Sequence, residues 1–515
     1  MKRMFWVVLI CLLAALAFAQ PEIEWARCYG GSGYEGAYSI QQTSDNGYVV
    51  AGYSVSSNDG DVSGWHGGDD YWIVKLDSLG NLIWQKCIGG SSADIARSVQ
   101  QTADGGYIVA GTSDSNNGDV IGNHGNDDSW IVKLDSLGNT VWQKCLGGTS
   151  DDFANFIQQT NDNGYIVAGY SAGDCWIAKI DTLGNIVWQE SFGGSRGDEI
   201  YSAQQTSDNG YIVAGYSASN DGDVSGNHAT SGTNDYWVVK LDSLGNLIWQ
   251  KCLGGSLNDI ATSVRQTNDG GYVVAGYSNS DDGDITGHHA GDGIHDYWVV
   301  KLDSLGNITW QKSLGGNYED YATSVQQTTD DGFIVAGRTR SNNGDVTGNH
   351  TDGRYDYWII KLSLFGDIAW QKCLGGSGGE GAYSIKQTDD NGFAIAGSSP
   401  SNDGDVAGNH GNDDFWIVKL FPDPPLTVTE TPISPPQTFA LSISPNPFNS
   451  VCRVDYPANT SVKIYDVRGT LVGTLSNGQN IWTPSKNLGS GIYFASTIDL
   501  SENKNLMTQK IVYIR

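Results

Sequence analysis

Basic residues are scarce in this chain of 515 residues, which has 29 lysines and arginines against 58 aspartates and glutamates. Lys2 and Arg3 belong to the N-terminal segment discussed below. Without them the counts are 27 and 58, which gives a formal net charge of −31. Such an acidic surface repels nucleic acid and anionic lipid, so we expect neither as a partner. The charge suits solubility outside the cell and the binding of cations or neutral ligands such as sugars.

Long apolar runs are also nearly absent. The one clear run extends from Phe5 to Ala17, follows Lys2 and Arg3, and ends at the small-x-small sequence Ala17-Phe18-Ala19. This pattern is typical of a secretory signal peptide, here residues 1–19 with cleavage after Ala19. No later stretch is long enough to span a membrane as a helix. We therefore expect no transmembrane segment in the mature protein, which leaves the cytoplasm.

Cysteine is infrequent, and its placement argues against a disulfide framework. Five of the eight cysteines occupy one repeated position, where two other copies have serine: Cys28, Cys87, Cys145, Cys252 and Cys373. Equivalent positions in neighbouring repeats should lie beyond the roughly 7 Å Cα separation that a disulfide tolerates. We therefore predict buried, small, unpaired side chains despite the oxidising destination.

A tandem repeat of about 60 residues fills most of the chain, with a tryptophan near the end of each copy: Trp25, Trp84, Trp142, Trp188, Trp249, Trp310 and Trp370. The clearest copy, 98–148, has four segments rich in Val, Ile, Tyr and Trp, at 98–102, 107–111, 130–134 and 140–146. Glycine-containing turns separate them, and helical spacing is absent. Each unit is therefore predicted to be a sheet of four strands.

The order of these segments predicts how the array ends. The first three segment types each occur seven times, and so does the fourth, but its first copy, 23–29, precedes all other segments. No fourth segment follows Leu420, so the N-terminal strand is free to complete the last sheet. We therefore predict an all-β fold in which residues 20–420 form a seven-bladed β-propeller of four-stranded repeats, closed by the N-terminal strand. An open solenoid is the alternative.

The C-terminal part of the chain differs in composition. Residues 421–438 are proline-rich and are predicted to be a semi-rigid linker. A small β domain over 439–515 follows, with the segments LSISPNPFNS (441–450), VKIYDVRGTLV (462–472), GIYF (491–494) and KIVYIR (510–515). The opening Pro445-Asn446-Pro447, the IYD hairpin and the basic last residue together resemble the C-terminal sorting domain of the type IX (Por) secretion system.

The resemblance implies an immunoglobulin-like β-sandwich that brings the chain to the type IX machinery. The protein would then be secreted or displayed on the outer-membrane surface. An accessory sandwich such as a carbohydrate-binding module is the alternative. The repeats are similar to tandem units of such exported proteins, and segment 76–84 is similar to a turn of pyrroloquinoline-quinone propellers. Neither similarity implies an enzymatic activity.

Histidine is confined to the long loop between the second and third segments, which reads G-D-[VI]-x-G-x-H in six units. The Asp/His pairs of this motif are Asp61/His66, Asp119/His124, Asp223/His228, Asp284/His289, Asp345/His350 and Asp405/His410. They are our candidates for ligand or cation binding, with calcium or a transition metal as the ion. The alternative is that each pair holds its own loop. The third unit lacks the pair but keeps its strands, which favours a role in binding.

A second acidic set follows the Gly-Gly of each crossover between units: Glu35, Asp94, Asp152, Asp198, Asp259, Asp320 and Glu380. Because the first strand of a blade lines the axis of a propeller, these carboxylates would gather at the channel mouth and recruit cations. Alternatively, each caps its own crossover by accepting hydrogen bonds from backbone N–H groups.

The sequence offers little for catalysis. No unit carries its own Ser/His/Asp or Cys/His set, and a repeated motif cannot single out one nucleophile. We therefore expect a binding or adhesion module for a glycan or protein ligand, and no enzyme. A glycan-processing or quinoprotein-like propeller enzyme is the alternative. The repeat is broken at a few positions that we interpret as surface specialisation: Trp65, Arg265, Arg338, Arg340, Arg354 and Lys386.

Overall fold

The computed structural model describes residues 20–228, 232–289, 291, 293–351, 353–423, 441–456, 460–476, 478–499 and 505–515. The predicted signal peptide and most of the predicted linker lie outside these ranges. The chain divides into two compact units, Met1–Leu426 and Thr427–Arg515. The described residues form strands and no helix, which confirms the all-β prediction. None of them therefore lies in a helix that could cross a membrane.

Seven four-stranded antiparallel sheets make up the first unit, and six of them use four consecutive strands. The strands of the first three are β2 (Glu35–Gln42), β3 (Tyr48–Ser54), β4 (Asp70–Leu76) and β5 (Leu82–Ile88); β6 (Asp94–Gln101), β7 (Tyr107–Ser113), β8 (Asp128–Leu134) and β9 (Thr140–Leu146); and β10 (Asp152–Gln159), β11 (Tyr165–Ser171), β12 (Asp174–Ile180) and β13 (Ile186–Phe192).

The next three sheets repeat this pattern. Their strands are β14 (Asp198–Gln205), β15 (Tyr211–Ser217), β16 (Asp235–Leu241) and β17 (Leu247–Leu253); β18 (Asp259–Gln266), β19 (Tyr272–Ser278), β20 (Asp296–Leu302) and β21 (Ile308–Leu314); and β22 (Asp320–Gln327), β23 (Phe333–Thr339), β24 (Asp356–Leu362) and β25 (Ile368–Leu374).

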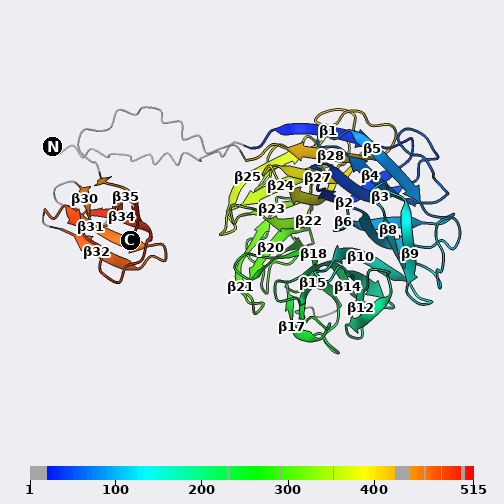
Figure 1. Ribbon diagram of the computed structural model, residues 1–515, viewed down its shortest axis with the longest axis horizontal. Coiled ribbons are helices and arrows are strands. Elements are labelled where there is room, and N and C mark those ends of the chain that lie inside the picture. The colour runs from blue at the N-terminus through cyan, green and yellow to red at the C-terminus, as the bar shows by residue number, and fades with distance from the viewer. Residues whose placement is uncertain are drawn as a thin grey trace, which may run out of the picture. The chain divides into compact units, whose positions relative to one another are not determined.

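The seventh sheet combines the two ends of the repeat region. It runs in the order β1 (Ile23–Tyr29), β28 (Asp414–Leu420), β27 (Phe393–Ser399) and β26 (Gly381–Gln387). Figure 1 shows β1, at the blue end of the colour bar, beside β28. The N-terminal strand thus supplies the fourth strand that the last repeat lacks, and its pairing protects an edge that would otherwise be open.

The core lies between neighbouring sheets. The third strand of each sheet is rich in aromatic and β-branched residues, and in β4 all seven residues are buried. Trp72 of this strand packs against Phe415 of the last sheet, and Tyr71 packs against Trp130 of the next sheet, each with ring centroids 4.5 Å apart. Because both faces of a sheet are covered in this way, its middle strands are nearly continuous in apolar residues.

A set of hydrogen bonds links each sheet to the next at the tight-turn end of the first strands. In each, the backbone N–H of a turn donates to the side-chain oxygen of the last glutamine in the next sheet's first strand. The donor and acceptor pairs are Ser44–Gln101, Ala103–Gln159, Asn161–Gln205, Ser207–Gln266, Asn268–Gln327, Thr329–Gln387 and Asp389–Gln42. The last pair joins the seventh sheet to the first.

The cysteines are free and buried throughout the described residues, as predicted. Cys87, for example, lies in the core between the first sheet and its neighbour. Burial raises the pKa of the Cys28 thiol to about 12, and the Asp414 carboxylate beside it adds to the shift. These thiols are therefore unreactive packing groups.

The second unit contains two small sheets. One has the order β29 (Ser442–Ser444), β30 (Cys452–Asp455) and β33 (Ile481–Trp482), and the other β32 (Leu471–Leu475), β31 (Thr460–Asp466), β34 (Gly491–Asp499) and β35 (Asn505–Tyr513). Side chains of both sheets share one core, which includes Val454, Ile464 and Trp482. In the predicted sorting motif, the Asn446 side chain donates to Lys510 O and accepts from Val512 N, both at 2.8 Å, and so ties the opening segment to β35.

Candidate functional site

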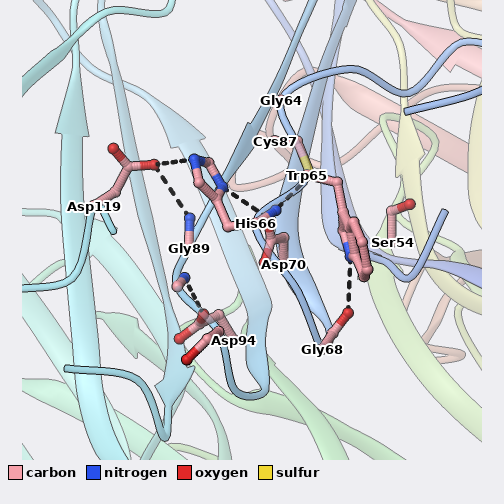
Figure 2. A network of polar contacts seen from close by, with 12 residues as sticks. Ser54, Gly64, Trp65, His66, Gly68, Asp70, Cys87, Gly89, Asp94 and Asp119 are labelled. Atoms are coloured by element: carbon pink, nitrogen blue, oxygen red, sulfur yellow. Dashed lines mark hydrogen bonds and ion pairs between the residues drawn. The ribbon is translucent and has the colours of Figure 1, made fainter. Parts of the chain in front are cut away.

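The motif histidine of five of the six long loops connects two neighbouring sheets. His66 precedes β4, and its backbone N–H donates to Asp70 Oδ2 at 2.8 Å while its Nδ1 lies 2.9 Å from the same oxygen. Its Nε2 lies 3.6 Å from Oδ2 of Asp119, which belongs to the next sheet's loop. Figure 2 shows the imidazole between these two carboxylates. Asp70, the first residue of β4, is fully buried.

The same contact recurs between four other pairs of loops. The Nε2–Oδ2 pairs are His228–Asp284 at 3.9 Å, His289–Asp345 at 3.3 Å, His350–Asp405 at 3.5 Å and His410–Asp61 at 4.0 Å. The histidine of one motif therefore contacts the aspartate of the next unit's motif, and not the aspartate of its own. The loop aspartate lies against the crossover that precedes it, where Asp61 Oδ2 accepts from Gly30 N at 3.3 Å, whereas the histidine lies near the start of the third strand.

The short third loop interrupts this series on both sides. His124 faces a sheet that has no loop aspartate, and the one described carboxylate near its ring is Asp128 of its own sheet, with Nδ1 and Oδ2 2.7 Å apart. Its side chain is 52% exposed, against 31–38% for the five bridging histidines. Asp223 has no histidine opposite it among the described residues. The chain thus supplies its own controls for the bridging contact.

The carboxylates around two bridging histidines shift their pKa values. Although burial of the ring lowers the pKa of His350, the hydrogen bond to Asp356 and the charges of Asp356 and Asp405 outweigh burial and raise it. The pKa of His410 is raised in the same way by Asp414 and Asp61. Burial raises the pKa of Asp414 itself to about 6, against the opposing effect of its hydrogen bonds from His410.

The second acidic set is enclosed by the crossovers. Each of its seven carboxylates accepts a hydrogen bond from the second glycine N–H of the preceding Gly-Gly, and each residue is at most 2% exposed. In the first sheet, Glu35 accepts from Gly31 N at 2.9 Å and from the hydroxyls of Ser54 and Ser56 at 2.8 and 2.6 Å. The geometry corresponds to the alternative in which each carboxylate caps its own crossover by accepting hydrogen bonds from backbone N–H groups. The carboxylates do not form an open ring at a channel mouth.

Two buried carboxyl groups from adjacent sheets meet at the first glycine of most crossovers. A Cβ on Gly89 would lie 2.7 Å from Asp94 Oδ2 and 2.8 Å from Asp70 Oδ1, so only glycine fits. Asp70 Oδ1 is buried and has no hydrogen-bond partner. Burial raises the pKa of Asp94 to about 6, and that of Asp259 and Asp320 to about 7. Among the described residues, no group of three or more His, Cys, Asp or Glu side chains could hold a metal ion.

Aromatic side chains form a second feature, which the sequence analysis missed. Tyr38 of β2 lies between Tyr53 and Tyr383, with centroids 5.8 and 5.0 Å away, and Arg97 stacks on it at 4.5 Å. Similar partly exposed rings occur in other sheets, toward the loop ends of the first two strands or in the loop before the third strand. We call these rings together the aromatic rim. Its members are Tyr38, Tyr53, Phe153, Tyr170, Tyr201, Tyr216, Tyr277, Tyr321, Tyr355 and Tyr383.

The aromatic rim changes from sheet to sheet, although the surrounding repeat is nearly constant. The position of Tyr38 is occupied in the other units by Arg97, Asn155, Tyr201, Thr262, Thr323 and Tyr383. Around Tyr321, the rings of Tyr277 and His295 lie 4.8 and 5.1 Å away, and Arg338 stacks over it at 5.0 Å. Comparing equivalent positions across the units could have revealed this variation.

The tail is where the chain matches a known family. Residues 442–514 match the family model described as "Secretion system C-terminal sorting domain". The tail is of the sorting-domain type. The match confirms the resemblance inferred from the tail motifs and indicates export by the type IX secretion system to the medium or the cell surface.

The chain is similar to curated proteins over about a quarter of its length. It is 26% identical over 158 residues to "Regulatory protein FlaEY" of Caulobacter vibrioides, covering 28% of this chain and 16% of that protein. It is 22% identical over 153 residues to the "Uncharacterized WD repeat-containing protein L264" of Acanthamoeba polyphaga mimivirus, covering 26% and 11%. The chain thus spans a small part of both relatives.

The solved structures that match the chain include PorZ, described as an essential bacterial surface component of the type-IX secretion system of Porphyromonas gingivalis. The match has a TM-score of 0.28 at 10% identity and covers 93% of this chain and 81% of that one. Sqt1 from Chaetomium thermophilum matches with a TM-score of 0.41 at 10% identity, covering 77% and 100%. With TM-scores below 0.5, these likenesses do not bear on function.

Proposed function

We propose that this protein is a binding module displayed outside the cell. Its repeat region is a closed seven-bladed β-propeller, and its aromatic rim takes an extracellular glycan or protein ligand without turnover. The pairing of β1 with β28 and the hydrogen bond from Asp389 to Gln42, which joins the seventh sheet to the first, support the closed form. The sorting domain supports delivery to the cell surface, because it matches the family that directs type IX export.

The aromatic rim is the observation that carries the binding function. A tyrosine presents a flat apolar face and a hydroxyl group at low conformational cost, which suits both a sugar ring and a protein surface. Tyr38, Tyr201 and Tyr383 line a central cavity of about 300 Å³ between the first strands. Side chains that vary on a constant scaffold are the expected signature of ligand specificity.

The bridging histidines support this function by making the loop face rigid. Each of them ties its loop to a buried aspartate and to the neighbouring loop, so five of the seven junctions are cross-linked by polar contacts. Loops held in this way lose little conformational freedom when a ligand binds, which favours affinity. We therefore assign the Asp/His pairs a supporting role for the site and place ligand contact at the aromatic rim.

A glycan array tests the proposal, run with the mature chain (20–515) and a Tyr38→Ala/Tyr383→Ala variant. We expect the wild type to bind a defined set of glycans and the variant to lose at least 10-fold in affinity. The matched control is Tyr318→Ala, because Tyr318 is 50% exposed and belongs to no ring pair. A parallel hydrolase and dehydrogenase screen on the bound glycans separates binding from turnover. If the screen finds turnover and one rim substitution abolishes it, the protein is an enzyme and not a binding module.

A further inference from the structure

A second row of glutamines lines the first strands, one residue before the row described above. Its side-chain oxygens accept hydrogen bonds from the backbone of the next sheet's first strand: Gln41 from Gln101 N, Gln100 from Gln159 N, Gln158 from Gln205 N, Gln204 from Gln266 N and Gln326 from Gln387 N. The innermost strand of a sheet exposes unpaired N–H groups at its edge. The glutamine row satisfies these groups in five of the seven sheets.

The two remaining sheets have cations at this position, Arg265 and Lys386. Neither side chain can accept a hydrogen bond. Accordingly, no side chain among the described residues accepts from the Gln327 or Gln42 N–H in the way that the glutamine row does. These substitutions therefore remove a structural hydrogen bond that the rest of the repeat keeps. The loss of a structural hydrogen bond in some copies of a repeat is expected where a function requires a different residue.

Both cations face the central cavity and have no counter-charge there. The cavity lining contains Arg97, Arg265 and Lys386 but no aspartate or glutamate. None of the three forms an ion pair with any residue that the structure describes, although acidic residues outnumber basic ones 58 to 29. Arg265 donates to Ser202 Oγ at 3.1 Å and Val264 O at 2.6 Å, and the Lys386 side chain donates no hydrogen bond to any described residue.

We propose that Arg265 and Lys386 form a binding site for a small oxyanion, a phosphate or carboxylate group, in the central cavity near the tight-turn end of the first strands. The two cations would supply charge-assisted hydrogen bonds, and the hydroxyls and amides of the neighbouring first strands would complete the shell. The site lies in the same cavity as Tyr38, Tyr201 and Tyr383, closer to the tight turns that follow the first strands, and it does not rest on the function proposed for the aromatic rim.

Proton linkage gives the site a distinctive signature. Burial lowers the pKa of the Lys386 amine to about 7, and the positive charge of Arg265 lowers it further. The other titratable groups that line the cavity are Arg97 and the phenols of Tyr38, Tyr201 and Tyr383, none of which is anionic near neutral pH. An oxyanion beside Lys386 raises this pKa, so binding at pH 8 takes up a proton.

Isothermal titration calorimetry with the mature chain tests the proposal. Inorganic phosphate and glucuronate serve as separate probes, at pH 8 in two buffers of different ionisation enthalpy. We expect at least one probe to bind with proton uptake, and affinity to fall at least 10-fold in an Arg265→Gln/Lys386→Gln variant. Glutamine is the residue of the other five sheets, so this variant restores the hydrogen-bonding row and folds with equal or higher Tm.

The matched control is Lys86→Gln/Lys144→Gln, which removes the same charge from the outer strands β5 and β9. Its affinity for the probe should remain within twofold of wild type. Equal losses in both double variants would mean a general charge effect and would overturn the site, as would undiminished binding in Arg265→Gln/Lys386→Gln or no binding of either probe by the wild type. The Tyr38→Ala/Tyr383→Ala variant should keep the oxyanion affinity, which separates this site from the rim.

Discussion

His410 reaches Asp61 across the junction between the last and first sheets, with Nε2 4.0 Å from Oδ2. These residues come from opposite ends of the repeat region, yet the contact is the same as that between loops of consecutive sheets. A contact that repeats at the join indicates that the two ends meet in the geometry of an ordinary junction. This repetition supports the structural role that we propose for the bridging histidines.

Replacing the bridging carboxylate should lower the pKa of the histidine that faces it. In Asp405→Asn, His350 loses one of the charges that raise its pKa, while the asparagine oxygen can still accept from Gly375 N. We expect a lower His350 pKa in an NMR pH titration. A histidine with a raised pKa stabilises the fold at low pH, and this contribution disappears as pH rises through the folded-state pKa. The variant should therefore lose about 0.5 kcal/mol at pH 5 and almost nothing at pH 8.

Asp223→Asn is the control for this experiment. Asp223 occupies the same loop position and accepts from Gly193 N at 3.4 Å, but no histidine of the described residues faces it. It should leave every histidine pKa and the Tm unchanged. If both variants shift the His350 titration equally, the effect comes from net charge and the bridging contact has no specific role.

The buried carboxyl groups predict a protein that is more stable in mild acid than in base. Burial raises the folded-state pKa of Asp320 to about 7, from an unfolded value near 4. Such a group stabilises the fold fully below pH 4, and its contribution is lost as pH rises to about 7. Asp94, Asp259 and Asp414 act in the same direction. We expect Tm by calorimetry to be higher at pH 5 than at pH 8.

Asp320→Asn should flatten this dependence, because asparagine keeps an acceptor for Gly316 N and does not ionise. The difference in unfolding free energy between pH 5 and pH 8 should shrink by on the order of 1 kcal/mol, since one pKa unit is worth about 1.4 kcal/mol.

Asp45→Asn should act at a different pH. Burial raises its pKa, but hydrogen bonds from Thr43 and Lys75 outweigh burial and lower it to about 2. Asp45→Asn should therefore be less stable than the wild type above pH 4, and this difference should disappear only as the pH falls below 4. A Tm that is flat from pH 5 to 8 in the wild type would contradict the assignment.

The strands could be predicted from the sequence because their signals are local. Each third strand, such as β4, combines aromatic and β-branched residues that favour extended backbone, and glycine turns mark its neighbours. The position of β1 could be predicted by counting segments, because one copy of the fourth segment precedes all the other segments. Both inferences need only adjacent residues and a regular repeat.

The site was less predictable because its contacts cross between sheets. His66 and Asp61 share one loop motif, but the carboxylate that faces the His66 Nε2 is Asp119 of the next unit. Nothing within one repeat indicates which neighbour a loop leans toward. The cations Arg265 and Lys386 were recognised as departures from the repeat, but the expected surface position is wrong, because both line the central cavity. Sequence shows that a position differs, and packing decides where its side chain points.

Export should depend on the anchored opening of the tail. Asn446→Ala removes two hydrogen bonds to the backbone of β35, which should cost the tail about 1–2 kcal/mol. We expect less protein at the cell surface and more retained inside the outer membrane, measured by fractionation and immunoblotting in the native host. Lys486→Ala, at an exposed position of the same unit, is the control. Mass spectrometry of the surface-bound wild type should find an N-terminus at Gln20. Unchanged surface display after deletion of 442–515 would contradict sorting by this tail.

Removing divalent cations should leave the loop face intact. The loop carboxylates already have partners, since Asp345 Oδ2 accepts from Gly315 N at 3.3 Å and lies 3.3 Å from His289 Nε2. We therefore expect chelation to change Tm by less than about 1 °C, whereas calcium bound at these loops would raise Tm by mass action. Differential scanning calorimetry with chelator and with millimolar calcium measures this. If calcium raises the wild-type Tm and Asp345→Asn abolishes that rise while Asp223→Asn does not, the bridging carboxylates bind cations and the histidines are ligands rather than braces.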